Sequence, residues 1–478
     1  MSELVNATPQ KGSTYLKLNI LVPIPLLQES KNSPEDISIG FMTSAGASFK
    51  ITSDDGTIIK ELFDASGVTN WYKLSSFSKF KVFNFSGRVY FCYDKTFSGP
   101  NEPAQNITQQ SFYYRYDKFE MTFNGNPADS ADTTSIDYWS IPITLNGLKG
   151  GKQTKHPKSH KKNSVNAFIN GATAQKIYEK LNAITSPTPP FHISGAIPAL
   201  VPGPYNVTPP KHTRFCRVIG PSSFPTFCPG NPGIPVMPYN IMLNYLESLY
   251  KIFKNKEFAR LKGNFAGVCI NNDPPPPYGP LAAQIYDASV TFLNDPSASY
   301  HNQNGKFVME VSGKGNKLNS RGGAEDTFSM QFKIDDLLNP SGIYGASAAF
   351  TLKYFREGSS KATIITESPQ NDLFGWITGD LLGGFNIGAI GSTVKVDNKE
   401  VGTLPSSEWY NIPQSNMFSN LQPNNPFYNQ YAEVLSKTTE AYNFPYTDRI
   451  KDSGVLVSLN PSLVEELEVI LEDSTVHL

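Results

Sequence analysis

The sequence predicts a mainly β protein that also contains an α/β part. Alternating apolar and polar segments, separated by turn-forming residues, fill residues 14–147 and return after residue 305. Between them lie two segments with the apolar period of a helix. With 478 residues, of which 39% are hydrophobic and 12% aromatic, the chain is long enough for two or three domains with substantial cores.

The first expected domain, residues 1–150, is rich in short strands. Its strand-like segments are YLKLNILVPI, ISIGFMT, FKVFNFSGRVYFCYD, SFYYRYDKFEMTFNG and SIDYWSIPITL. Clusters of Gly, Asn, Asp and Ser separate these segments and supply the turns. Regular short strands with such turns predict a β-sandwich or barrel.

The second expected domain, residues 151–300, is a mixed α/β domain inserted after the β-rich part. One expected helix, residues 173–184, places Ile177, Leu181 and Ile184 on one face. A longer one, residues 240–261, begins at the N-cap Asn240 and has an apolar face made of Met242, Leu246, Leu249 and Phe253. Proline-rich stretches such as DPPPPYGP favour stiff, extended connections around these helices.

The third expected region, residues 301–478, returns to the β domain. Its strand-like segments are GKFVMEVSG, FSMQFKI, AAFTLKYF and KATIITE, and two helical segments follow at 372–390 and 427–439. The last segment, residues 442–471, has the pattern of closing strands.

Composition and charge exclude several classes of protein. The net charge of −1 carries no electrostatic signature of nucleic-acid binding. The chain has no apolar run of about 18 residues, so no membrane-spanning helix is expected. The first residues, MSELVNATPQKGS, lack the basic and apolar segments of a secretory signal. Two of the four cysteines, Cys216 and Cys228, bracket a proline-rich loop and could pair.

A run of basic residues follows the first domain between Lys149 and Lys162. It contains six lysines together with His156 and His160. Such a run is usually a solvated, mobile loop, and we favour that interpretation here. The alternative is a patch that binds an anion or a polyanionic surface.

Two carboxylates in the β-rich part form the candidate catalytic pair. Side chains alternate across a strand, so Glu120, Thr122 and Asn124 share one face while Phe119, Met121 and Phe123 face the core. Asp137 lies inside the next strand-like segment, residues 135–145, on the same face as Ser135 and Trp139. Glycoside hydrolysis needs one protonated and one ionised carboxyl group, and adjacent strands can supply them.

Two other interpretations compete with catalysis. Carboxylates in a strand are commonly just solvated positions. Oxygen ligands for calcium are also present, although without EF-hand spacing, at Asn124, Asn126, Asp129, Asp132 and Asp137. Zinc and serine-hydrolase motifs are missing from the sequence, which leaves the carboxylates as the chemistry-bearing groups.

Several motifs in the chain resemble those of glycoside hydrolase family 64, the endo-β-1,3-glucanases built on a thaumatin-like β-domain. The motifs are FEMTFNG with TTSIDYWSIPITL, then SGRVYFCYDKTFSG, RVIGPSSF and FYNQYAEVLSKTTEAYNFPYTD, and they follow the family order along most of the chain. Thr447 replaces the first Asp of the family's Phe-Pro-Tyr-Asp-Asp run. The loop Asn124 to Thr134 also lacks the expected tryptophan.

The resemblance implies a fold and an activity. It implies a thaumatin-like sandwich or barrel packed on an α/β domain, with a wide acidic cleft between them. It implies an extracellular, monomeric, inverting β-1,3-glucanase that needs no cofactor or metal and takes a β-1,3-glucan polysaccharide. Glu120 matches the general acid and Asp137 the general base. The substrate-binding positions carried over or expected at the cleft are Thr122, Asn124, Thr134, Trp139, Tyr446 and Asp448. The alternative is a non-catalytic thaumatin-like protein that binds β-glucan.

Overall fold

The structure is a computed structural model, and a set of ranges covers the residues that it describes. These are 15–22, 37–43, 48–52, 58–63, 70–76, 78–93, 114–184, 192–194, 215–223, 239–267, 282–296, 301–302, 305–317, 325–339, 341–355, 360–367 and 373–476. Within them the protein is mainly β, with several sheets, as the sequence predicts. Cys228 lies outside the described residues, and so does the side chain of Cys216.

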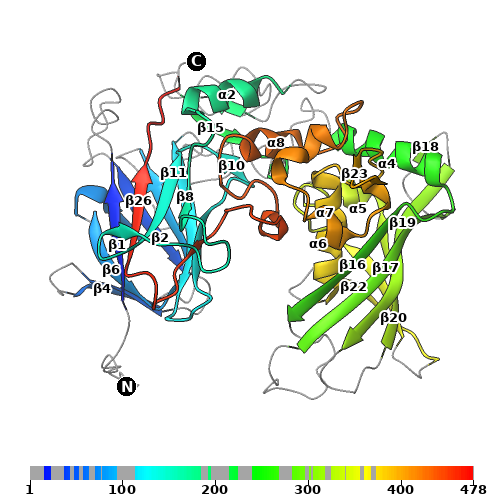
Figure 1. The fold of residues 1–478 in the computed structure, drawn as a ribbon, viewed down its shortest axis with the longest axis horizontal. Helices are drawn as coiled ribbons and strands as arrows, with labels where there is room; N and C mark the ends of the chain where they lie inside the picture. Colours follow the sequence, from blue (N-terminus) through cyan, green and yellow to red (C-terminus); the bar gives the residue numbers. More distant parts are fainter. Residues whose placement is uncertain are drawn as a thin grey trace, which may run out of the picture.

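The first lobe is a sandwich of two sheets, drawn mainly in blue and cyan in Figure 1. One sheet has the order β12 (Lys152–Gln153), β11 (Ile143–Lys149), β26 (Glu466–Leu471), β1 (Leu16–Leu21), β6 (Lys79–Phe83), β3 (Ser48–Thr52) and β4 (Ile58–Phe63), with β13 (Ser164–Val165) beside β11. The other has the order β25 (Val457–Ser458), β9 (Ser130–Thr133), β8 (Tyr116–Phe123), β7 (Phe85–Cys92), β2 (Ser38–Thr43) and β5 (Asn70–Lys73).

Alternation along the strands builds the core between these two sheets. Phe119, Met121 and Phe123 of β8 are buried there, as predicted, and they pack in one apolar cluster with Leu18 of β1 and Val469 of β26. The strand β26 lies between β1 and β11, so the end of the chain closes this lobe. The prediction of closing strands near the C-terminus is therefore confirmed.

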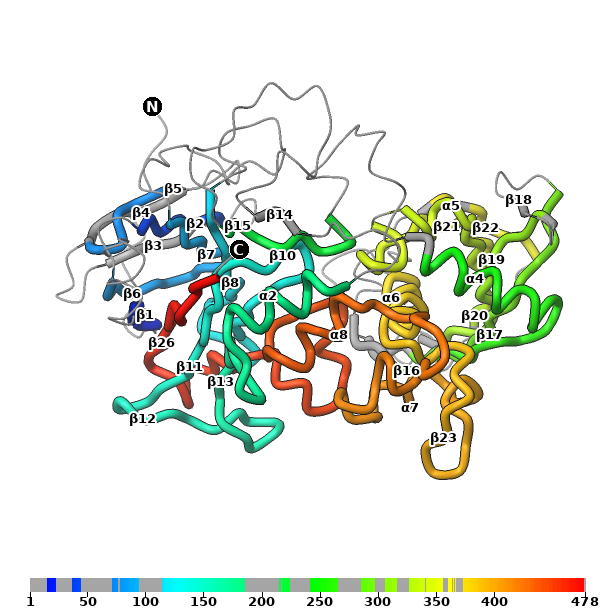
Figure 2. Tube along the Cα trace, turned by 90° about the horizontal axis from the view of Figure 1, so that it is seen from above, coloured from blue at the N-terminus to red at the C-terminus, as the bar shows by residue number. Residues whose placement is uncertain are grey.

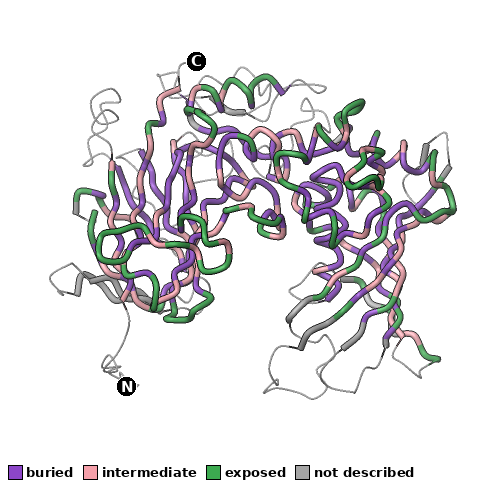
Figure 3. The backbone as a smooth tube through the Cα atoms, in the orientation of Figure 1, coloured by how far each residue is buried: buried purple, intermediate pink, exposed green. Residues whose placement is uncertain are grey.

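The second lobe is an antiparallel sheet with helices packed on it. Its strands follow the order β16 (Ala259–Gly267), β17 (Ala282–Asn294), β19 (Gly305–Lys317), β20 (Glu325–Lys333), β21 (Phe350–Phe355) and β22 (Thr363–Glu367), with β18 (His301–Asn302) beside β19. The helices of this lobe are α4 (Tyr239–Phe253), α5 (Ile334–Leu338), α6 (Leu373–Asn386) and α7 (Ser406–Trp409). A small hairpin, β23 (Lys395–Val396) and β24 (Lys399–Glu400), follows α6. Figure 3 shows that buried backbone concentrates in the middle of each lobe.

The expected domain boundary at residue 300 is wrong. Strands β17 and β19 pair antiparallel from the pair Gln284 and Lys317 to the pair Asn294 and Phe307, so residue 300 falls inside a hairpin. Strands 305–367 do not rejoin the first sandwich, because consecutive strands pair with each other to form their own sheet. Among the described elements after residue 300, β25 and β26 are the strands that return to the first lobe.

A third, smaller group of elements packs beside the first lobe. It contains α2 (Ala174–Asn182), α8 (Gln430–Ser436) and a sheet of β10 (Tyr138–Trp139), β15 (Phe215–Ile219) and β14 (His192–Ser194). Figure 2 shows α2 and α8 side by side. Ile177, Leu181 and Ile184 are buried, as predicted for one face of a helix.

The limits of the other predicted helices need correction. Helix α4 begins at Tyr239, which places Asn240 inside the helix, and it ends at Phe253, before the strand β16. Helices α6 and α8 lie within the predicted segments, and Asn429 caps α8 by accepting from the backbone N–H of Ala432 at 3.0 Å. In the described part of the chain, no helix is both long and apolar enough to cross a membrane.

Candidate active site

The candidate site lies on the outer face of β8, opposite the sandwich core. Alternation turns Lys118, Glu120 and Thr122 outward. The antiparallel register places Glu120 opposite Arg88 of β7 on one side and opposite Asp132 of β9 on the other. Cα atoms of such opposed residues lie about 4.5–5.5 Å apart, so these side chains are immediate neighbours.

Glu120 is held by an arginine from the neighbouring strand. The Arg88 Nε donates to Glu120 Oε1 at 3.0 Å, and both side chains are partly exposed. Next along the same face, the hydroxyls of Ser86 and Thr122 lie 3.0 Å apart. Asn124 is exposed just beyond the end of β8. The predicted row of Glu120, Thr122 and Asn124 therefore lies along the accessible outer face of β8.

Asp137 lies in a bend before β10 and not inside a strand, which corrects the prediction of one strand over residues 135–145. Lys118 Nζ, on a side chain only 1% exposed, lies 3.3 Å from Asp137 Oδ2. The hydroxyl of Ser223 donates to Asp137 Oδ1 at 2.7 Å. Burial alone would raise the pKa of Asp137, but Lys118 and these hydrogen bonds hold it below its ordinary value.

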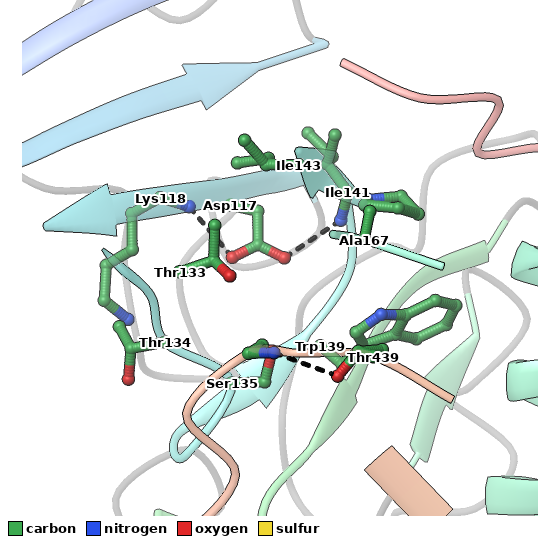
Figure 4. Close-up of a pocket in the computed structure, with 12 residues that line it drawn as sticks. Asp117, Lys118, Thr133, Thr134, Ser135, Trp139, Ile141, Ile143, Ala167 and Thr439 are labelled. Atoms are coloured by element: carbon green, nitrogen blue, oxygen red, sulfur yellow. Dashed lines mark hydrogen bonds between the residues drawn. The ribbon is translucent and has the colours of Figure 1, made fainter. Parts of the chain in front are cut away.

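Asp117 explains why the predicted strand is broken. Its carboxylate accepts from the backbone N–H groups of Lys118, Ser140 and Ile141, at 2.8, 2.8 and 2.9 Å. Burial raises the pKa of Asp117 to about 7, although Lys118 and these donors oppose that effect. The side chain faces a cavity of about 20 Å³, shown in Figure 4, which is large enough for roughly one water molecule. Asp117 thus bonds the segment between β10 and β11 to strand β8, on which Lys118 and Glu120 lie.

Two more carboxyl groups complete what we call the acidic cluster, which is Glu120, Asp132, Asp137 and Asp448. Burial, together with the nearby charges of Glu120 and Asp448, raises the pKa of Asp132 well above its ordinary value, although Lys118 and Arg88 oppose the shift. Asp448 is exposed and forms a hydrogen bond with Tyr442. Neighbouring carboxyl groups of the cluster therefore have pKa values shifted in opposite directions, raised for Asp132 and lowered for Asp137.

Lys118 relates the position of Asp137 to that of Glu120. Glu120 is two residues along β8 from Lys118, which corresponds to about 7 Å along an extended strand. Lys118 reaches Asp137 directly, and among the described residues no hydrogen bond or ion pair joins Asp137 to Glu120. The buried ammonium group of Lys118 thus joins Asp137 to the strand that carries Glu120.

The other predicted substrate-binding residues lie in different environments. Trp139 is 3% exposed and packs against Phe215 in the core beneath α2, so it has no surface for a sugar. Thr134 is buried and lines the small cavity behind the site. Tyr446 is half-buried, and its ring lies against the Arg449 guanidinium. The prediction that Trp139 and Thr134 bind sugar is therefore wrong, because both side chains are buried.

The basic run between Lys149 and Lys162 forms an ordered loop beside the cluster. Asn163 fixes its end, because the Asn163 amide donates to Ser458 O at 2.9 Å and to Thr154 Oγ1 at 3.0 Å. The lysines themselves are exposed, in line with a solvated loop. The loop also lines a pocket of about 780 Å³ that Asp448 and Ser130 share.

The calcium interpretation is not supported at its central residue. Asp129 is buried, and its Oδ2 accepts from the backbone N–H groups of Asn124 at 2.7 Å and Asn126 at 2.8 Å. The carboxylate therefore stabilises its own loop. The described residues contain no group of three or more His, Cys, Asp or Glu side chains arranged to hold a metal ion.

We expect Asp129→Ala to lower the free energy of unfolding by about 1–3 kcal/mol, because two backbone N–H groups of the loop lose a charged acceptor. Urea unfolding measures this loss, with Asp129→Asn as the control that retains one acceptor oxygen. We also expect the melting temperature of the unaltered protein to be the same with and without EDTA. A fall with EDTA that Asp129→Ala abolishes would restore the calcium interpretation.

Sequence reasoning missed Arg88, Lys118 and Ser223 and gave Asp132 only a place among calcium ligands. Lys118 shares its face with Glu120 by simple alternation, so its position in the sequence was a usable signal. Arg88 and Asp132 depend on strand register, and Ser223 comes from a distant loop. Those three contacts had no local signal.

Comparisons of this chain with protein-family models, with curated proteins and with solved structures returned no match.

Proposed function

We propose that this protein is an inverting endo-β-1,3-glucanase of the kind that the sequence motifs resemble. One observation carries the proposal: carboxyl groups beside the outer face of β8 have pKa values shifted in opposite directions. Lys118 and Ser223 hold the pKa of Asp137 low, whereas burial and the nearby charges of Glu120 and Asp448 raise the pKa of Asp132, which lies opposite Glu120. Glycoside hydrolysis by inversion requires one carboxyl group of each kind.

In the proposed mechanism, Glu120 is the general acid and Asp137 the general base. Glu120 donates its proton to the glycosidic oxygen while the bond from that oxygen to the anomeric carbon breaks. Asp137 takes a proton from a water molecule, whose oxygen bonds to the anomeric carbon from the opposite face. Inversion needs carboxyl groups about 6.5–9.5 Å apart, and the spacer Lys118 favours a separation of this order.

The surroundings of the cluster support a polysaccharide substrate. Thr122 and Asn124 extend the accessible edge from Glu120, and hydroxyl and amide groups suit sugar hydroxyls. The pocket of about 780 Å³ beside Asp448 provides room for sugar units on that side. We further propose that the two-sheet sandwich of the first lobe is a thaumatin-like β-domain. Because one chain supplies both carboxyl groups, we propose that a monomer is active.

We expect the purified protein to release sugar from linear β-1,3-glucan, with the α-anomer as the first product. Proton NMR of the anomeric signals during early hydrolysis measures both the release and its stereochemistry. A first product in the β-anomer would rule out inversion. No release, together with retained binding to the glucan, would favour a non-catalytic β-glucan-binding protein.

A further inference from the structure

The described molecule contains a buried ion pair that the proposed catalysis does not use. Asp380 of α6 and Arg449 are 5% and 7% exposed at their side chains, and Arg449 Nη1 donates to Asp380 Oδ1. The second carboxylate oxygen of Asp380 accepts from the hydroxyls of Tyr286 and Ser406, the latter at 2.7 Å. Removing charge from water is costly, so a pair this buried needs such partners around it.

Two aromatic rings enclose the same guanidinium. The Arg449 Cζ lies 3.9 Å from the ring centroid of Trp376 and 4.2 Å from that of Tyr446. Gly379 makes this approach feasible, because a Cβ atom there would lie 2.5 Å from the Tyr446 ring and 2.9 Å from Arg449 Nη2. The two rings and Asp380 therefore hold the Arg449 guanidinium in one position against α6.

The backbone between the stacked ring and the ion pair is tightly wound. Tyr446 has a φ of 70°, in the left-handed region that non-glycine residues rarely adopt. It caps the 3₁₀ turn η7 (Thr447–Arg449). Thr447 is fully buried, and its hydroxyl bonds the backbone of Phe444, donating to the carbonyl at 2.5 Å and accepting from the N–H at 3.2 Å. These hydrogen bonds join the turn to Phe444, which is part of the second lobe's core, and so fix the conformation of the turn.

Asp448 lies inside that turn, between the stacked Tyr446 and the buried Arg449, yet it faces the first lobe. It hydrogen-bonds to Tyr442, whose backbone N–H donates to the Thr133 carbonyl of β9 at 2.8 Å, and its charge acts on the adjacent Asp132. Phe444 and Ile450 belong to the core of the second lobe, whereas Val457 and Leu459 belong to the core of the sandwich. Figures 1 and 2 place this orange to red segment between the two lobes.

We propose that the Asp380–Arg449 pair is a positioning device that holds Asp448 near β9 and Asp132, so that helix α6 of the second lobe sets the charge environment of the acidic cluster. The inference rests on the proposed function for its catalytic meaning. Asp380 and Arg449 touch no reacting atom, and both act through the position of Asp448. Thr447, at the position of the family's first Asp, then has a structural role in the turn.

The test compares the double variant Asp380→Asn/Arg449→Met with Asp448→Asn. Neutralising both partners avoids an uncompensated buried charge, which makes this variant safer for folding than either single change. The groups that act on Asp132 are Glu120, Lys118, Arg88, Asp448 and the nearby Tyr442. Asp448→Asn removes the charge of Asp448, and the double variant is expected to displace it. Neither variant changes any of the other groups.

We expect the titration midpoint of the Asp132 carboxyl to fall by roughly one pH unit in both variants, as loss of one nearby like charge should do. Carbon-13 NMR of labelled aspartate, assigned with Asp132→Asn, measures it. Combining all three substitutions should produce no further fall. The control Asp287→Asn removes a carboxylate from β17 on the same lobe and should leave the midpoint unchanged.

An unchanged midpoint in a folded Asp380→Asn/Arg449→Met protein would overturn the proposal, and so would a further fall on adding Asp448→Asn. This titration needs no turnover, so it can fail while glucan hydrolysis is established, or succeed while hydrolysis is not found. If hydrolysis is established, the kcat/KM profile should shift along the pH axis in both variants. A purely structural defect would lower the rate without shifting the profile.

Discussion

Glu120→Gln is expected to lower kcat for β-1,3-glucan hydrolysis by about 10²- to 10⁴-fold, the usual contribution of a positioned acid or base. Glutamine keeps the shape of the side chain and an oxygen that Arg88 can still bond, so the backbone around β8 should be retained. It has no proton to give to the leaving oxygen. Initial rates of reducing-sugar release measure the effect, and binding of a β-1,3-linked oligosaccharide should change far less.

A second glutamate-to-glutamine variant, away from the site, tests whether the loss of rate is specific to the Glu120 carboxyl. Glu465 is 59% exposed and pairs with Lys149, so Glu465→Gln should retain the full rate. The neighbour Asp132 provides the second comparison, because it faces Glu120 across the ladder and has a raised pKa. If Glu120→Gln remains active while Asp132→Asn is inactive, the acid role belongs to Asp132.

Lys118→Met is expected to move the acid limb of the kcat/KM profile upward by about 1–3 pH units, because a neighbouring opposite charge shifts a pKa by that amount. In the unaltered protein Lys118 keeps the pKa of Asp137 low, so the base stays ionised as the pH falls. Without the ammonium group, burial dominates and the pKa of Asp137 rises. The rate should therefore be lost at moderately acidic pH and recover above the new limb.

The sign and the assignment of this shift can both be checked. Asp117 and Asp132 also respond to Lys118, but their pKa values are already raised, so the lowest limb belongs to Asp137. The control Lys17→Met removes a partly exposed lysine that pairs with Glu466, away from the cluster, and should leave the limb in place. An equal loss of rate at every pH in Lys118→Met would contradict the assignment of Asp137 as the base.

Local pattern was enough for the elements whose burial follows a simple period. The alternation in β8 correctly separated Phe119, Met121 and Phe123 from Glu120, and the helical period correctly identified the buried face of α2. Helix limits were less accurate where a strand follows directly, as at the end of α4. The strand predicted over residues 135–145 failed because Asp117, from β8, binds the backbone at Ser140 and Ile141 and bends it.

The sequence by itself determined the β-rich character of the chain, the inward and outward faces of β8, and the outward position of Glu120, because each depends on side chains a few residues apart. Only the tertiary structure decided which charges meet there. Asp132 reaches Glu120 through strand register, Ser223 reaches Asp137 from the turn after β15, and Asp448 is placed by a turn bound to the second lobe. The charge state of a carboxyl depends on every group within a few ångströms, and folding brings those groups together from distant parts of the chain.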